Sequence, residues 1–373
     1  MSDEAQLAAR APAPPADQDE LRVERFDDLD DLREDWQRLA EAAGNIFGTW
    51  EWASAWWDEL GRDHRLLVHA CRRRDGSVAG ILPLCSISKR AFTTVRFVGH
   101  GPADLLGPIC APADRPALAQ ALGAALDSIP ERVDLLLAER LAAEEGWNAL
   151  LGGTHVRREP SPVLRLDGMS WEELLAARSS NFRQQVRRRE RKLVREHGLR
   201  YRLADDPERL EDDLDHLFRL HERRWAKGSQ AFSRERWAFH RSFARSAQAR
   251  GWLRLWLAEI GGEPVAAWYG FRFAGVEWYY QAGRDPSWEQ ASIGFVLLAH
   301  SIREACADGV REYRLLLGDE PYKARFSNGE TCLETVAVPR TMAGRAAVRG
   351  AVASRHLPGR AAKISGWLID RGP

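Results

Sequence analysis

The chain has 373 residues, 45% of them hydrophobic and 29% charged, so it is long enough for two globular domains with ordinary cores. Its 54 basic residues balance its 54 acidic ones, which excludes a polyanionic partner recruited by overall charge. The five cysteines contain no CxxC pair and the ten histidines form no HExxH motif. We therefore expect neither a disulfide framework nor a metal site.

The N-terminus is rich in alanine, proline and acidic residues, and it lacks the basic and apolar regions of a secretory signal. We expect residues 1–20 to form a disordered tail. No run of eighteen apolar residues occurs anywhere, so we expect no transmembrane segment and a cytoplasmic location.

One order of elements occurs twice along the chain. Each copy has two apolar strands joined by a Gly-containing turn, then a third strand, an Ala/Leu-rich helix and a short apolar strand. In the first copy these are residues 66–71, 78–84, 94–98, 116–127 and 133–137. In the second copy they are residues 253–258, 264–270, 276–281, 293–308 and 313–317. A duplicated α/β unit explains this order better than chance does.

A basic helix is predicted between the copies, at residues 179–198. A serine at either of its first two positions is suited to cap it, and Gly198 is suited to end it. Residues 178–202 hold ten Arg or Lys against two Glu. Two interpretations stay open: a solvated linker helix, or an anion-binding face for phosphate, nucleotide or acidic glycan. Sequence-specific DNA binding is disfavoured, because no helix-turn-helix or zinc pattern accompanies the basic run. The apolar stripe of this helix is Phe182, Val186 and Leu193.

A second cluster lies on the next predicted helix. His221 and Arg224 are three residues apart and share a face, and Trp225 and Gly228 follow them. A lone helical histidine is more often structural than functional. The tryptophan and the glycine-containing loop nevertheless favour a helix end that borders a cleft.

A third cluster follows the third strand of the second copy. That strand ends at Gln281, and the next helix begins near Ser292. Ser292 is suited to cap the helix, and Gly294 allows a phosphate to approach the backbone. The unpaired amides of residues 292–295 would attract an anion.

The run from Gly318 to Phe326 follows the last strand of the second copy. It concentrates proton-transfer and anion-binding side chains at the carboxyl end of a strand, where open α/β proteins place their chemistry. The alternative is a salt-bridged loop. The side chains concerned are Asp319, Glu320, Tyr322, Lys323 and Arg325.

These motifs together resemble the CelD/BcsL-like acetyltransferases, which belong to the GNAT superfamily, carry a BioF2-like acetyltransferase domain and are named for bacterial cellulose or exopolysaccharide synthesis. The resemblance covers residues 165–340 well and residues 21–165 by pattern only. It extends distantly to the Fem-type aminoacyl transferases of peptidoglycan synthesis. The residues that carry it are 181–183, 187–188, 220–225, 291–298 and 317–326.

The resemblance implies an α/β (α+β) fold of two fused GNAT-like halves, each with a mixed, mostly antiparallel sheet flanked by helices. One departure concerns the usual phosphate loop, Arg/Gln-x-x-Gly-x-Gly/Ala, of which only Ser292 and Gly294 are recognisable. The expected division is a tail at 1–20, an N-terminal half at 21–165, a basic linker helix at 166–199, an acyltransferase half at 200–340 and a basic tail at 341–373.

The resemblance also implies a reaction. An acetyl or other acyl group would pass directly from acyl-CoA to an amine or hydroxyl of a saccharide or exopolysaccharide precursor of the cellulose type, without a metal. Asp319 or Glu320 would act as the base, and Tyr322 would protonate the leaving thiolate. The cofactor-binding residues would be Gln281, Ser292, Gly294, Phe295 and Lys323. The substrate-binding residues would be Arg183, His221, Arg224, Trp225 and Arg325.

Two other functions stay open. One is a Fem-like transferase that uses aminoacyl-tRNA, for which the basic helix is suited. The other is a non-catalytic scaffold of a polysaccharide synthase complex, and the basic tail at 341–373 allows contact with the inner membrane surface. The first half has no counterpart of the 319–323 motif, so we expect it to hold no donor site and to have a structural or acceptor-binding role.

Overall fold

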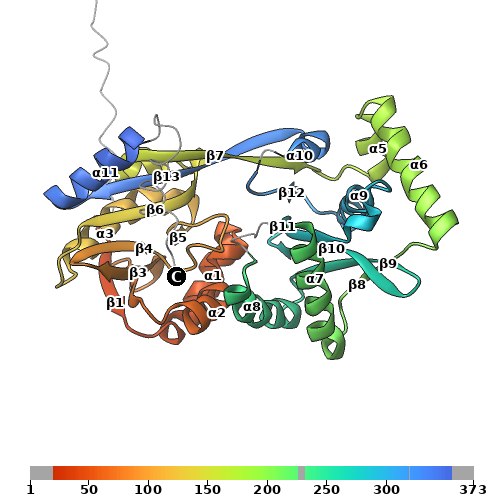
Figure 1. Ribbon diagram of the computed structural model, residues 1–373. Helices are drawn as coiled ribbons and strands as arrows, with labels where there is room; N and C mark the ends of the chain where they lie inside the picture. Colours follow the sequence, from red (N-terminus) through yellow and green to blue (C-terminus); the bar gives the residue numbers. More distant parts are fainter. Residues whose placement is uncertain (1–19, 226–231, 319, 355–373) are drawn as a thin grey trace, which may run out of the picture.

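The computed structural model describes residues 20–225, 232–318 and 320–354. The predicted N-terminal tail therefore lies outside the described residues except for Glu20, as does the predicted C-terminal tail beyond residue 354. The described chain forms one large mixed sheet flanked by helices, which confirms the predicted fold class (Figure 1). Within the described ranges, no helix is both long and apolar enough to cross a membrane.

The sheet is continuous, in the order β1-β2-β3-β4-β6-β13-β7-β12-β11-β10-β9-β8, with β5 paired to β3 beside this path. The strands from the first half of the chain are β1 (Arg22–Phe26), β2 (Arg65–Arg72), β3 (Val78–Lys89), β4 (Phe92–Phe97), β5 (Ile109–Cys110), β6 (Leu135–Ala142) and β7 (Thr154–Arg165). Those from the second half are β8 (Arg200–Leu203), β9 (Leu253–Ile260), β10 (Glu263–Phe273), β11 (Val276–Arg284), β12 (Glu312–Arg314) and β13 (Gly329–Pro339).

The helices repeat in the same order as the strands. Each half has two helices after its first strand and one helix before its short parallel strand, so the predicted duplication is present and begins one strand earlier than expected. The helices of the first half are α1 (Arg33–Ala43), α2 (Trp50–Leu60), α3 (Arg115–Asp127) and α4 (Trp147–Leu151). Those that follow are α5 (Trp171–Ala176), α6 (Ser180–His197), α7 (Leu210–Arg224), α8 (Trp237–Ala249), α9 (Ile293–Ala307), α10 (Pro321–Phe326) and α11 (Met342–Ser354).

The two halves exchange their last strands. β7 of the first half pairs with β12 of the second, and β13 of the second half pairs with β6 of the first. β7 and β13 also pair with each other along most of their length, and in Figure 1 they run together across the top of both halves. Each half is therefore completed by a strand of the other, and the sheet runs through the whole molecule without an edge at its centre.

A buried aromatic cluster joins the halves on one face of this sheet. The Trp52 ring on α2 makes edge contacts with Phe239 and Phe243 on α8, at 4.9 and 4.7 Å between ring centroids. Close by, the buried Glu51 carboxylate accepts hydrogen bonds from Arg250, the nearer at 2.6 Å. Aromatic burial of this kind stabilises the contact between the halves, and loss of Arg250 alone would leave the Glu51 carboxylate buried without a cation.

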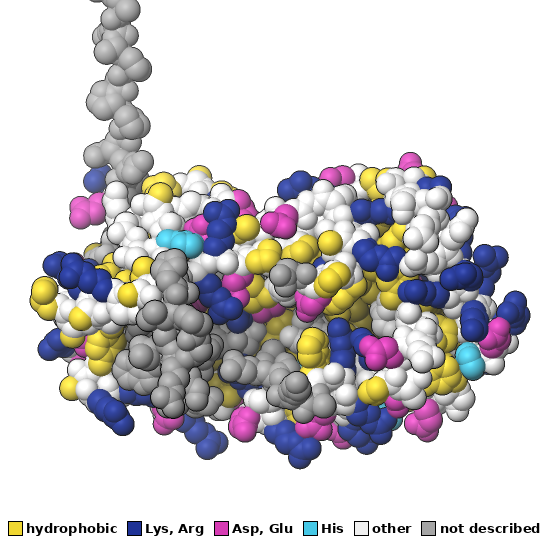
Figure 2. Space-filling view, turned by 45° about the horizontal axis from the view of Figure 1, so that its top comes forward, with side chains coloured by type: hydrophobic (Ala, Val, Ile, Leu, Met, Phe, Trp, Pro, Cys, Tyr) yellow, Lys and Arg dark blue, Asp and Glu magenta, His cyan; other side chains and the backbone are white. Residues whose placement is uncertain are grey.

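The basic helix α6 forms where its sequence predicts. The Ser179 side chain accepts a hydrogen bond from the Phe182 amide, and Gly198 ends the helix in the left-handed conformation. The predicted apolar stripe is buried against the core of the second half, and α6 packs on α9. The rest of its surface is polar apart from the exposed Val194, and Figure 2 shows Lys and Arg side chains gathered at this end of the molecule.

His300 on α9 makes stability sensitive to acid. Its ring stacks on Tyr201 at 3.8 Å, and its Nδ1 accepts a hydrogen bond from Arg303 at 2.8 Å. Burial, with the charge of Arg303, lowers its pKa from 6.5 to about 3. The unfolded chain therefore binds this proton more readily, so the contribution of His300 is fully present above about pH 6.5 and is lost as the pH falls towards 3.

We expect the free energy of unfolding to fall by about 2 kcal/mol between pH 7.5 and pH 5 through His300 alone, because the unfolded chain binds the proton that the folded chain does not. Urea unfolding at both pH values measures the loss for the native chain and for His300→Gln, which has no titrating group there. The variant should lose less stability than the native chain on acidification. His197→Gln, which removes an exposed histidine, is the matched control. An equal loss in all three proteins would contradict the assignment.

Candidate functional site

An opening in the sheet lies between the parallel strands β11 and β12. They pair over three positions only, from Val276 with Glu312 to Trp278 with Arg314. β11 then continues beside β10 alone, whereas the chain after Arg314 turns to β7, where the Leu315 amide donates to the Pro162 carbonyl at 3.0 Å. The predicted strand at 313–317 is thus wrong in its second part, because Leu316 has a φ of 57° that an extended strand does not allow.

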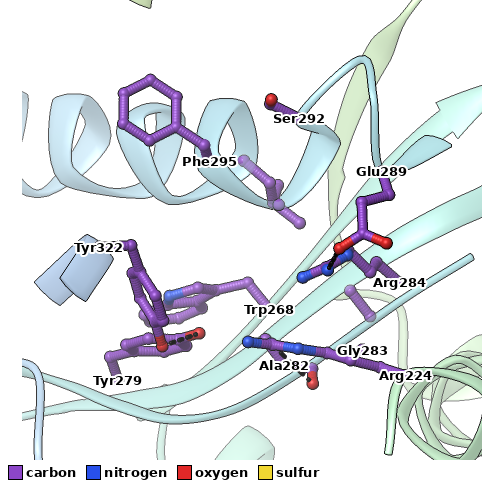
Figure 3. Close-up of a pocket in the computed structure, with 13 residues that line it drawn as sticks. Arg224, Trp268, Tyr279, Ala282, Gly283, Arg284, Glu289, Ser292, Phe295 and Tyr322 are labelled. Atoms are coloured by element: carbon purple, nitrogen blue, oxygen red, sulfur yellow. Dashed lines mark hydrogen bonds and ion pairs between the residues drawn. The ribbon is translucent and has the colours of Figure 1, made fainter. Parts of the chain in front are cut away.

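A cavity of about 230 Å³ lies at this opening (Figure 3). Its walls come from the end of α7, from β10 and β11, from the start of α9 and from α10. The residues that line it are Arg224, Ala267, Trp268, Tyr279, Ala282, Gly283, Arg284, Glu289, Ser292, Gly294, Phe295, Leu297 and Tyr322.

Two tyrosine hydroxyls meet inside this cavity. The hydroxyl of Tyr322 on α10 lies 3.2 Å from that of Tyr279 on β11, and the Tyr279 ring stacks on Trp268 at 5.6 Å. Burial, together with the neighbouring Tyr279, raises the pKa of Tyr322 well above its ordinary value. The Tyr322 hydroxyl therefore stays protonated at neutral pH.

Arg224 brings a positive charge to these hydroxyls. α7 can lie directly on β11 because Gly283 has no side chain: a Cβ there would lie 2.4 Å from the His221 backbone nitrogen. This approach places the Arg224 guanidinium where it points towards Tyr279 and Tyr322 (Figure 3), and where it donates to the Ala282 carbonyl at 3.3 Å. A cation in this position favours the phenolate that forms when Tyr322 gives up its proton.

The start of α9 forms the opposite wall, and Arg284 pairs there with Glu289 at 2.5 Å. Ser292, Gly294 and Phe295 all line the cavity, as their predicted role requires. The expected serine cap is wrong, because Ser292 is left-handed, with a φ of 58°, and its side chain caps no amide among the described residues. The Phe295 amide donates a hydrogen bond to the Ser292 carbonyl, so it is not free to bind a ligand. Phe295 therefore contributes its ring to the cavity wall.

Three of the predicted site residues lie near the cavity without lining it, namely His221, Trp225 and Gln281. His221 is buried on α7, and its ring packs against Phe232 at 5.0 Å. Burial lowers the pKa of His221 to about 4, whereas a hydrogen bond with the Gln281 side chain acts in the opposite direction. Trp225 is 39% exposed, with the Arg224 guanidinium 4.8 Å from its ring centroid. Their roles in binding stay predictions.

The 319–323 motif divides into two parts. Asp319 lies outside the described residues. The Glu320 carboxylate is 3.0 Å from the buried Lys323 ammonium, which also donates to the Leu317 carbonyl. Of this run only Tyr322 lines the cavity, so the structure gives Lys323 and Glu320 a place in holding the loop, and their predicted roles towards ligand stay untested.

The two remaining predicted substrate-binding arginines, Arg183 on α6 and Arg325 on α10, differ in their distance from the cavity. Arg183 donates to the carbonyls of Ala176 and Arg178, at 3.2 and 2.6 Å, and so joins α5 to α6. Arg325 lies closer to the cavity, with its guanidinium 4.8 Å from the ring centroid of Phe295.

Weaker sequence signals point to the other cavity residues. Tyr279 and Trp268 lie in predicted strands, whereas Arg284 lies three residues beyond the predicted end of β11. Only the point at which β12 diverges shows that Tyr279 faces an opening.

The equivalent opening in the first half is filled by its own side chains. β4 and β6 are parallel and pair at Thr94 with Leu135 and at Val95 with Leu136. Directly beyond these pairs, the buried Arg96 guanidinium contacts the buried Glu139 carboxylate at 2.5 Å. This ion pair supports the expectation that the first half holds no donor site.

Residues 180–324 match the protein family described as "Acetyltransferase (GNAT) domain". The second half of the chain therefore contains an acyltransferase domain of the GNAT type. No curated protein sequence matches the chain.

Solved structures with the same fold match most of the chain. FemX has 11% identity and a TM-score of 0.59, with 80% of this chain and 95% of that one covered. The C-terminal domain of a putative lysylphosphatidylglycerol synthetase from Agrobacterium fabrum has 10% identity, a TM-score of 0.54, and coverage of 86% and 95%. L-PGS from Bacillus licheniformis has 14% identity, a TM-score of 0.51, and coverage of 85% and 96%. At such identities the likeness shows the fold alone. The predicted GNAT domain is confirmed, whereas membership of the CelD/BcsL-like group stays a prediction.

Proposed function

We propose that the cavity between β11 and β12 binds the thioester end of an acyl-CoA and that the acyl group passes from it to an amine or hydroxyl acceptor. One observation carries this proposal: the protonated Tyr322 hydroxyl lies at the point where the two parallel strands of a GNAT domain diverge. Beyond Trp278, β11 has backbone groups that no longer pair with β12, and these are available to the donor arm.

The proton transfers follow from this placement. The acceptor nitrogen or oxygen attacks the thioester carbon, forms the new bond and loses a proton, while the bond from carbon to sulfur breaks. The leaving thiolate takes the proton of Tyr322, and Arg224 stabilises the phenolate for the moment it exists. The base that takes the proton of the acceptor stays Asp319 or Glu320 in our proposal, with water as a relay.

The acceptor class we propose is a saccharide or exopolysaccharide precursor, on the strength of the family resemblance. The exposed Trp225 ring beside Arg224 supports it, because an aromatic face next to a cation suits an anionic or hydroxylated ring. His221 would lie on the acceptor side of β11, and Gln281 would bind the donor.

A charge inside the cavity tests donor binding. Gly294 has open space around it, since an added Cβ would approach only the Arg284 side chain, at 3.7 Å. Gly294→Asp should therefore fold, and it should disfavour the donor because it places a negative charge in the cavity that would take the arm of a polyanionic molecule. We expect saturating acetyl-CoA to raise the Tm of the native chain, with about 2.7 kcal/mol of stabilisation at a hundredfold excess over Kd, and to leave the variant unchanged.

Gly123→Asp is the matched control, because Gly123 lies on α3 in the first half and an added Cβ there meets nothing within 4 Å. It should keep the full shift. Loss of the shift in both variants, or its persistence in Gly294→Asp, would count against this donor site. A shift with aminoacyl-tRNA and none with any acyl-CoA would favour the Fem-like alternative, which has the fold likeness to FemX in its support.

A further inference from the structure

A group of three arginines lies beside the cavity, on α6 and α10. The guanidinium of Arg189 is 5.4 Å from the ring centroid of Phe295, and that of Arg325 is 4.8 Å from the same centroid. Phe295 itself lines the cavity. Two cations from different helices therefore lie against Phe295 without lining the cavity themselves. Arg188 directly precedes Arg189 on α6.

Among the described residues these cations have no carboxylate partner, unlike the arginines near the start of α9. Arg325 donates to the Gln185 amide oxygen at 2.7 Å, a neutral group. Within the described ranges, no carboxylate pairs with Arg188, Arg189 or Arg325. Burial, followed by the charges of Arg325 and Arg188, lowers the pKa of Arg189. Like charges held together at a cost to stability indicate an anion that is bound there.

On the other side of the cavity, Arg224 points to the two tyrosine hydroxyls, and two further arginines are neutralised by carboxylates. Arg284 pairs with Glu289 at 2.5 Å, and Arg223 pairs with Asp285 at 2.8 Å. The chain also lacks the arginine of the usual phosphate loop before α9. Positive charge for the donor phosphates must therefore come from another segment.

The size of the cavity places the phosphates outside it. Pockets that enclose a whole drug-sized ligand measure about 300–1,000 Å³, and this cavity measures about 230 Å³. It can hold a thioester and part of its arm, but the phosphorylated end of a coenzyme A must lie beyond the wall. Phe295 and the arginines around it stand at that wall.

We propose that Arg189 and Arg325, with Arg188 beside them, bind the phosphate groups of the acyl donor. The inference rests on the proposed function, and it assigns the phosphate site to α6 and α10, which flank the start of α9. Guanidinium groups suit this task, since they bind phosphate oxygens in pairs and stay charged.

The test compares three thioesters: acetyl-CoA, 3′-dephospho-acetyl-CoA, which lacks one phosphate, and S-acetylpantetheine, which lacks all the phosphates together with the adenosine. Their Kd values are measured calorimetrically for the native chain, Arg189→Ala and Arg191→Ala. Arg191 is the matched control, since it is exposed on the same helix and two residues, or 200° of rotation, away from Arg189.

We expect Arg189→Ala to weaken acetyl-CoA binding by about 10- to 100-fold, the loss of a charge-assisted contact. S-acetylpantetheine should bind the variant and the native chain equally, and Arg191→Ala should match the native chain throughout. If 3′-dephospho-acetyl-CoA also loses affinity in the variant, the arginines bind the diphosphate; if it does not, they bind the 3′-phosphate. Either result supports the proposal.

Two results would overturn it. Equal weakening of all three thioesters would mean that Arg189 acts by packing on Phe295, and unchanged binding would mean that it meets no phosphate. In both cases the native chain still binds acetyl-CoA, and the proposed function stands. Failure of the native chain to bind any of the three would instead remove the proposed function, and this inference with it. Arg189→Lys, which keeps the charge, should retain more affinity for acetyl-CoA than Arg189→Ala does.

Discussion

Replacement of Tyr322 by phenylalanine is expected to lower turnover by about 10²–10⁴-fold while acetyl-CoA still binds. The change removes one hydroxyl and keeps the ring, so the packing of α10 on the core of the second half is retained. Without that hydroxyl the leaving thiolate has no positioned proton donor. Thiol release measures turnover, and the ligand-induced Tm shift measures binding.

Tyr313→Phe is the matched control for this experiment. Tyr313 is buried on β12 and its hydroxyl lies 2.8 Å from that of Ser301, away from the cavity lining. Its loss should cost about 1 kcal/mol of stability and leave thiol release unchanged. Equal, mild effects of the two substitutions would show that Tyr322 is structural, and the non-catalytic scaffold would then be favoured over the acyltransferase. Tyr279→Phe should fall between them, because Tyr279 only orients Tyr322.

Removal of Arg96 alone is expected to cost about 3–5 kcal/mol of stability, because it leaves the buried Glu139 carboxylate without its partner. Urea unfolding of Arg96→Met measures this loss. The double variant Arg96→Met with Glu139→Leu should be the more stable of the two, since it removes both buried charges at once.

The same variants test whether the first half takes part in donor binding. The double variant changes no residue of the second half, so its acetyl-CoA affinity should equal that of the native chain. A double variant that is folded but has lost acetyl-CoA binding would contradict the assignment of the donor site to the β11–β12 opening.

Local features of the fold were predictable from the sequence. The cap at Ser179, the stop at Gly198 and the buried stripe of α6 depend on neighbours within a few residues, and all are present. The hairpins β2–β3 and β9–β10 were also predictable, because a strand pattern and its turn lie together in the chain.

The strand exchange could not be predicted in this way. β7 pairs with β12 and β13, whose partner residues lie about 150 to 180 positions further along the chain, and the same alternating pattern would suit a partner in its own half. The burial of Lys323 depends in the same way on the Leu317 carbonyl, whose position follows from where β12 ends.

The candidate site was predicted in part. Ser292, Gly294, Phe295, Arg224 and Tyr322 meet at one cavity, although they come from three helices. The Ser292 cap failed because its backbone is already fixed by the turn in which the Ser292 amide donates to the Glu289 carbonyl. Side-chain propensity does not reveal such a turn.

The measurement that tests the account most directly is native mass spectrometry of the purified chain mixed with acetyl-CoA, and separately with aminoacyl-tRNA. We expect a one-to-one complex of the native chain with acetyl-CoA, and no such complex of Gly294→Asp. A chain that binds aminoacyl-tRNA and no acyl-CoA of any length would contradict it.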